Sequence, residues 1–169
     1  MERARDFIVK PTPERPIIRF IQKSDLKELV NLCKLHAIFE ESEYDSTDKA
    51  WKLNKHLFSD NPITYCLVVE QEEELIGYAT YTKQFSTWDA SFYVYMDCLF
   101  LKEEARGNGI GESLVNHIKI EATKLNCNLI QWQTPSVNER AIKFYNRIGG
   151  VSKSKERYFL KTKPHFLDE

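Results

Sequence analysis

The sequence has almost no net charge, because its 24 lysines and arginines are balanced by 25 aspartates and glutamates, for a formal charge of −1. Proteins that bind nucleic acid or an anionic membrane surface usually carry an excess of positive charge. The sequence also lacks an apolar run approaching the roughly 20 residues that cross a bilayer, and no signal-like stretch follows Met1. We therefore expect a cytoplasmic protein without nucleic-acid or membrane partners.

Metal-binding spacings are also missing. The four histidines show no ligand spacing, and no C-x-x-C motif occurs. The four cysteines lie far apart among apolar neighbours, at Cys33, Cys66, Cys98 and Cys127. Isolated cysteines of this kind are typical of buried free thiols in a reducing compartment. We expect no metal site.

The apolar pattern predicts an α+β protein with a mixed sheet. The 169 residues are 42% hydrophobic, enough for one core, so we expect a single domain over 17–169 after a proline-containing N-terminal arm, 1–16. Runs rich in β-branched and aromatic residues predict strands at 17–21, 64–71, 75–85 and 92–101, and further strands are expected at 128–134 and 157–162. Helical periodicity predicts helices at 24–39 with Ser24 as the cap, from Ser46 or Thr47 to Phe58, at 109–125 and at 138–148.

A glycine-rich loop, Arg106-Gly107-Asn108-Gly109-Ile110-Gly111, lies between a predicted strand and a predicted helix. Glycines let the backbone aim several N–H groups at one anion, and the helix dipole adds partial positive charge there. A plain strand-to-helix turn explains the glycines equally well. The Gly-Lys-Ser/Thr of a nucleotide-binding P-loop is absent, and so is the acidic residue of a dinucleotide-binding unit.

The loop resembles the pyrophosphate motif of the GNAT N-acetyltransferase superfamily, Arg/Gln-x-x-Gly-x-Gly/Ala. A second GNAT signature follows, because Asn138-x-x-Ala141-x-x-x-Tyr145-x-x-x-Gly149 resembles the family's helix motif. The resemblance covers about 17–162 and implies a mostly antiparallel sheet of about seven strands with about four flanking helices, in which strands four and five splay apart around acetyl-CoA. It implies that the cofactor contacts Leu99, Phe100, Leu101, Arg106, Gly107, Asn108, Gly109, Ile110, Gly111, Glu112, Asn138, Ala141 and Tyr145.

Two residues are candidates for the chemistry. The resemblance implies that Tyr145 protonates the departing CoA thiolate, although a tyrosine beside Phe144 also suits a core. Tyr95-Met96-Asp97-Cys98 is similar to the Tyr-Leu-Glu-Asp segment of the diamine and polyamine branch, so Asp97 takes the position of its catalytic glutamate. Burial would raise the pKa of such a carboxyl toward that of a useful base. A structural carboxylate that accepts loop N–H groups is the alternative.

The acceptor side is predicted from aromatic and acidic residues. Acidic residues between 40 and 45 would attract a cationic amine, unless they only form a solvated loop. Aromatic faces near carboxylates suit an ammonium, although tryptophans also serve in packing. The candidate acceptor residues are Phe39, Glu40, Trp88, Asp97, Gln131, Trp132 and Gln133.

These features predict an enzyme that transfers an acetyl group from acetyl-CoA to a primary amine of a small cationic molecule, resembling a diamine or polyamine, by direct attack in a ternary complex. GNAT relatives are often dimers, so we expect a homodimer. The sequence leaves open a protein or peptide N-acetyltransferase, a non-catalytic acyl-CoA sensor and a structural module.

Overall fold

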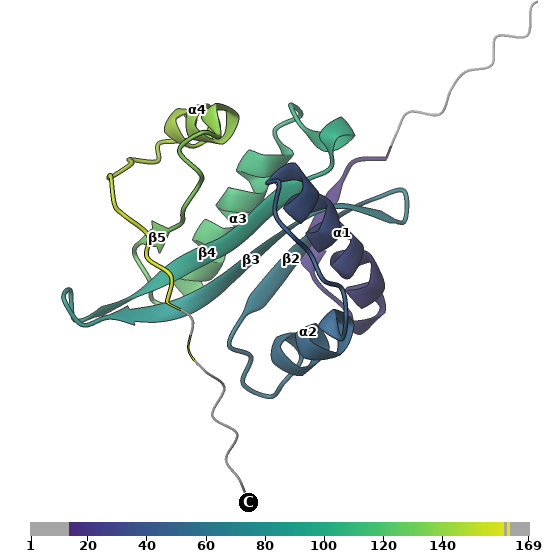
Figure 1. Cartoon of the computed structure of the whole chain (residues 1–169), viewed down its shortest axis with the longest axis horizontal. Helices are drawn as coiled ribbons and strands as arrows, with labels where there is room; N and C mark the ends of the chain where they lie inside the picture. The colour runs from purple at the N-terminus through teal and green to yellow at the C-terminus, as the bar shows by residue number, and fades with distance from the viewer. Residues whose placement is uncertain (1–13, 161, 163–169) are drawn as a thin grey trace, which may run out of the picture. The chain divides into compact units, whose positions relative to one another are not determined.

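Five strands form one sheet in a computed structural model that describes residues 14–160 and 162. The strands are β1 (Ile17–Phe20), β2 (Tyr65–Gln71), β3 (Glu74–Ser86), β4 (Ser91–Leu101) and β5 (Ile130–Gln131). They lie in chain order, and all neighbours are antiparallel except β4 and β5, which are parallel (Figure 1). The predicted α+β class is therefore confirmed.

The helices lie where the apolar periodicity predicts them. They are α1 (Leu26–Phe39), α2 (Lys49–Leu57), α3 (Ile110–Lys124) and α4 (Glu139–Arg147), with short 3₁₀ turns η1 (Lys23–Asp25) and η2 (Glu103–Ala105). Among the described residues, no helix is long and apolar enough to cross a membrane.

The chain divides into two compact units, Met1–Gln133 and Thr134–Glu169. The first contains the sheet and α1 to α3, and the second contains α4. Most of the predicted N-terminal arm, residues 1–13, lies outside the described residues, and 14–16 have no regular structure.

Helices cover both faces of the sheet in the first unit (Figure 1). One face packs its apolar side chains against α1 and α2 in a core cluster that includes Leu29, Leu32, Leu57, Cys66, Val68, Tyr78 and Phe100. The alternate strand residues, such as Val69 and Tyr81, point to the opposite face, where α3 buries Leu114 and Ile118. All four cysteines are free thiols, but only Cys66 and Cys127 are fully buried.

Strands β4 and β5 separate soon after they meet. Their pairing joins Val94 to Ile130 and Tyr95 to Gln131 and then ends. Strand β4 continues to Leu101 with β3 as its described partner. The predicted splay is confirmed, because the β5-side edge of β4 beyond Tyr95 has no strand neighbour among residues 14–160.

The sheet differs from the predicted pattern in the length of one strand and in the number of strands. Strand β5 has two residues instead of seven. Residues Arg157–Leu160 and Thr162 are not in a strand, so the described sheet has five strands and not about seven. A strand needs a neighbour for its hydrogen bonds, and the side chains of Tyr158, Phe159 and Leu160 are 90%, 80% and 93% exposed.

Helix starts also differ, because local side-chain bonds override the simple capping pattern. Ser24 lies inside η1, and the Gln22 N–H donates instead to Asp25 Oδ2 at 2.7 Å. Helix α2 begins at Lys49, after Asp48 in the left-handed region at φ 56°. The Thr47 N–H donates to Asp45 Oδ1 at 2.9 Å, in a turn that precedes the helix.

Asp25 joins the start of α1 to the sheet, and we expect Asp25→Ala to lower the free energy of unfolding by about 2–3 kcal/mol. Asp25 is 8% exposed, and its carboxylate accepts from the Arg19 guanidinium at 2.6 and 3.1 Å. Arg19 Nε also donates to Glu70 Oε2 at 2.6 Å. In Asp25→Ala the Arg19 guanidinium loses its bonds to Asp25 and keeps its bond to Glu70. Urea denaturation measures the effect, and Asp60→Ala, at an exposed position, is the control.

The same contact predicts a pH dependence. The Arg19 guanidinium holds the pKa of Asp25 below its usual value of 3.8. The stabilisation is therefore fully present above pH 3.8 and is lost as the pH falls through the lower pKa of the folded state. A variant whose stability equals that of the wild type at pH 6 would contradict this role.

Candidate active site

The glycine-rich loop forms an open turn at the start of α3. Gly107 and Gly109 have φ of 86° and 77°, in the left-handed region that glycine adopts without strain. A Cβ built on either would meet no atom within 4 Å. The N-cap residue of α3 is Gly109, which has no side chain that could bond the first helix amides, and such unbonded N–H groups are what an anion site requires.

Arg106 links this loop to α1. Its Nε donates to the Leu101 carbonyl oxygen at 2.8 Å. Its guanidinium carbon lies 4.3 Å from the ring centroid of Phe39 and 5.5 Å from that of Phe100. The predicted role of Arg106 toward pyrophosphate stays a prediction. The structure shows in addition that Arg106, a predicted cofactor residue, stacks on the ring of Phe39, a predicted acceptor residue.

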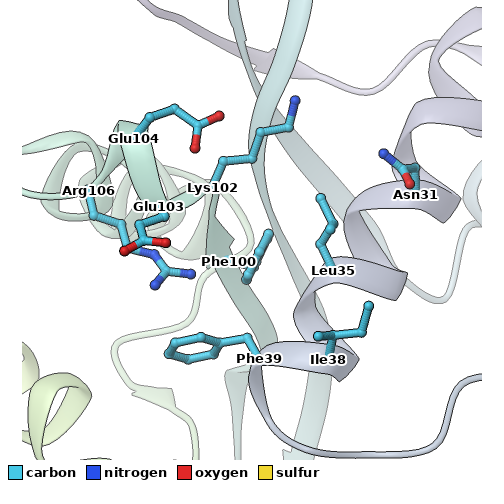
Figure 2. A pocket seen from close by; sticks show the side chains of 9 residues that line it. All are labelled: Asn31, Leu35, Ile38, Phe39, Phe100, Lys102, Glu103, Glu104 and Arg106. Carbon is cyan, nitrogen blue, oxygen red and sulfur yellow. The ribbon is translucent and has the colours of Figure 1, made fainter.

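A groove of about 500 Å³ runs between α1 and the end of β4 (Figure 2). It is lined by Asn31, Leu35, Ile38, Phe39, Phe100, Lys102, Glu103, Glu104 and Arg106. Its floor is aromatic, and one wall carries the carboxylates of η2. Phe39, Phe100 and Arg106 were singled out from the sequence; the others were missed, because only the packing of α1 beside β4 brings them together.

Asp97 occupies a β-bulge in β4. Thr80 on β3 pairs with Cys98 and Tyr81 pairs with Met96, so Asp97 is the extra residue between them. A bulge turns the side chains of neighbouring residues toward one face, here the face that α1 covers. The side chain of Asp97 is exposed, so the burial expected for a base at this position is not observed.

His36 forms a polar contact that sequence reasoning missed. Its Nδ1 lies 2.9 Å from Tyr78 Oη and its Nε2 lies 3.4 Å from Glu40 Oε1. The ring stacks on Phe100, with centroids 5.1 Å apart and an interplanar angle of 23°. Burial lowers the pKa of His36, against the opposite effect of Glu40 and Asp97. Helical spacing places His36 beside Glu40, but only the fold adds Tyr78.

The other predicted acceptor residues lie at separate places in the first unit. Trp88, 95% exposed, is in the β3–β4 hairpin and does not line the groove. Gln131 pairs with Tyr95, and Gln133 Nε2 donates to Tyr95 Oη at 2.5 Å. Trp132, half-buried, lies between them in sequence. The structure thus groups these glutamines around Tyr95.

The second unit holds the helix motif. Asn138 Oδ1 accepts from the Ala141 N–H at 3.1 Å, so Asn138 caps α4. Ala141 and Tyr145 follow at helical spacing on the same face. The half-buried Tyr145 ring lies 5.0 Å from that of Phe144.

Comparison with known proteins gives consistent results. The acetyltransferase (GNAT) family profile matches residues 24–150. Thialysine N-epsilon-acetyltransferase of Mus musculus is 25% identical over 140 residues, 78% of this chain and 82% of that protein. Spermidine/spermine N(1)-acetyltransferase-like protein 1 of Homo sapiens is 25% identical over 146 residues, 82% of this chain and 21% of that protein. An aminoglycoside N-acetyltransferase solved with CoA has a similar fold, with a TM-score of 0.77, 17% identity and coverage of 90% and 99%.

Proposed function

The chain belongs to the acetyltransferase (GNAT) family, and from this premise we propose that it transfers the acetyl group of acetyl-CoA to a primary amine of a small cationic molecule of the diamine or polyamine class. The observation that carries the proposal is the aromatic groove beside the open edge of β4, where Phe39 meets Arg106. The name of the relative from Homo sapiens supports a polyamine acceptor, and the name of the relative from Mus musculus supports the side-chain amine of a small amino acid.

Acetyl-CoA is expected to bind through backbone groups in the first unit. The amides of 107–112 would hold the pyrophosphate, because they lie at a helix N-terminus with no capping side chain from Gly109. The edge of Leu99–Leu101 would pair with the pantetheine amides as a strand does, through backbone groups other than the Leu101 carbonyl oxygen, which accepts from Arg106 Nε. The family motif assigns Asn138, Ala141 and Tyr145 of the second unit to the same cofactor.

The acceptor ammonium would be attracted by Glu40 and Asp97 and would rest against the Phe39 ring. Asp97 would assist removal of its proton, directly or through water. The free amine then attacks the thioester carbonyl carbon, the C–S bond breaks, and Tyr145 protonates the departing thiolate. The proton that the attacking nitrogen loses on becoming an amide restores the Tyr145 hydroxyl. No covalent acyl-enzyme forms in this scheme.

Three wider expectations accompany this proposal. The family match spans both compact units, which supports one functional domain over 17–169. Four free cysteines support a reducing, cytoplasmic location. The exposed apolar side chains of Tyr158, Phe159 and Leu160 support burial in a homodimer.

The test is an acceptor panel with the purified full chain. Diamines, polyamines, amino acids, aminoglycosides and a lysine peptide are compared at equal concentration, and CoA release is followed with a thiol reagent. We expect diamines or polyamines to give the highest kcat/KM, at least about tenfold above the peptide, which corresponds to about 1.4 kcal/mol. Preference for the peptide would favour a protein N-acetyltransferase, and parallel double-reciprocal plots would contradict the ternary complex.

A further inference from the structure

The corner formed by α1, β3 and β4 contains a histidine held on three sides. Phe100 stacks on the His36 ring, Tyr78 contacts its Nδ1, and Glu40 faces its Nε2. The His36 side chain keeps 16% exposure and that of Glu40 keeps 39%. Tyr78, 2% exposed, is on the buried side. The ring therefore has a fixed buried edge and an edge that solvent reaches.

We propose that His36 accepts the proton of the acceptor ammonium at Nε2, while Tyr78 holds Nδ1 and Glu40 holds the ammonium. This inference rests on the function proposed above and makes His36, in place of the exposed Asp97, the group that accepts the ammonium proton. It requires the tautomer in which Nδ1–H donates to Tyr78 Oη, which leaves the lone pair of Nε2 beside Glu40.

The position of Tyr78 favours this tautomer. Burial raises the pKa of the Tyr78 phenol far above its usual value, so the oxygen keeps its proton. The thiols of Cys33 and Cys98 lie beside the same phenol, and they offer its O–H an acceptor other than the imidazole. The phenol oxygen then accepts from Nδ1–H, and the basic nitrogen of His36 is the one on the exposed edge.

Glu40 keeps the electrostatic free energy of the proton transfer small, because it stabilises the positive charge both before and after the transfer. Its Oε1 lies 3.4 Å from Nε2, so one –NH₃⁺ group can reach both acceptors. When an ammonium N–H bond breaks, its electron pair stays on nitrogen and the proton bonds to Nε2. The positive charge remains next to the same carboxylate, because an imidazolium–Glu40 pair replaces the ammonium–Glu40 pair.

The contact with Phe100 places this base beside the segment of β4 proposed for the pantetheine arm. Phe100 lies between Leu99 and Leu101, whose backbone forms the open edge proposed for the pantetheine arm. The freed amine lone pair attacks the thioester carbonyl carbon and the C–S bond breaks. The attacking nitrogen loses its second proton as the amide forms, this proton accounts for the one that the departing thiolate gains, and Nε2 returns the first proton to solvent through the exposed edge.

The charged and polar groups around His36 determine the pKa of its imidazole. Glu40 on α1 and Asp97 on β4 favour the imidazolium, Arg106 disfavours it, and Tyr78 on β3 bonds Nδ1. Burial is the largest effect and lowers the pKa of His36 below 6.5. The imidazole is therefore unprotonated at neutral pH, as a base must be.

The first experiment compares His36→Gln with His56→Gln, which makes the same change at an exposed position on α2. We expect His36→Gln to lower amine kcat/KM by about 100-fold, with acetyl-CoA affinity within twofold of the wild type. The wild-type profile should fall on the acid side through a pKa below 6.5, and the variant should lack that limb. Retention of the limb in His36→Gln, or its loss in Asp97→Asn instead, would overturn the assignment.

The second experiment does not depend on turnover. ¹⁵N-labelled histidine in the full chain reports the His36 tautomer by long-range ¹H–¹⁵N NMR at pH 7.5. We expect protonated Nδ1 and unprotonated Nε2, and a shift of the Nε2 resonance when putrescine is added with CoA. Tyr78→Phe should reduce the Nδ1–H population without unfolding the protein. A dominant Nε2–H tautomer would refute the proposal even if the protein acetylates amines, whereas inactivity toward every amine refutes only the proposed function.

Discussion

Tyr145→Phe is expected to lower kcat by about 100-fold or more, because a phenol that protonates the leaving thiolate contributes roughly 10²–10⁴ in rate. The substitution keeps the ring that packs 5.0 Å from Phe144 and removes only the hydroxyl. Acetyl-CoA affinity should stay within twofold of the wild type. Steady-state kinetics and calorimetric titration with CoA separate the two quantities.

A matched control is Tyr158→Phe, because Tyr158 lies in the same compact unit and is 90% exposed. It should leave kcat unchanged. Thiol esters with more acidic leaving groups need less protonation, so they should partly restore the Tyr145→Phe rate. An unchanged kcat in Tyr145→Phe would exclude the tyrosine as the acid and leave it a packing residue.

Gly109→Ala is expected to weaken acetyl-CoA binding by at least tenfold, about 1.4 kcal/mol. A methyl group at this position meets no protein atom within 4 Å, so it clashes only with a ligand held against the loop. The left-handed φ of 77° adds a folding cost of about 1 kcal/mol. Thermal stabilisation by acetyl-CoA measures the binding loss directly.

Gly149→Ala is the matched control, because Gly149 has φ 90° and an equally open Cβ position. It should show the same loss of intrinsic stability while keeping acetyl-CoA affinity within about threefold, about 0.65 kcal/mol. Equal losses of affinity in both variants would indicate that backbone strain, and not contact with the ligand, is responsible. The anion site would then need to be sought elsewhere.

Local sequence patterns were sufficient to predict most of the helices and strands and the glycine-rich loop. The loop from Arg106 to Gly111 lies within one strand-to-helix junction, so its residues are brought together by a few backbone angles that glycine permits. The cap of α4 is likewise local, because Asn138 bonds a residue three positions ahead. Patterns that span only a few residues can be recognised in the sequence without knowing what packs against the helix or strand.

Features that depend on pairing between distant segments were predicted less well. The two-residue length of β5 depends on where β4 and β5 part, and a strand was predicted over 157–162 although its described residues have no sheet partner. The bulge that contains Asp97 arises from the register of β4 against β3. The alternation of residues along β4 alone does not predict the register of β4 against β3.

The sequence by itself determined the family, the order of the helices and strands and the glycine-rich loop, since each depends on residues within a few turns of one another. The tertiary structure alone decided the groove under Arg106 and the contact between His36 and Tyr78, which are 42 positions apart in the chain. Such contacts form only when α1 packs on the sheet, because burial and side-chain geometry, and not sequence spacing, determine which polar groups meet.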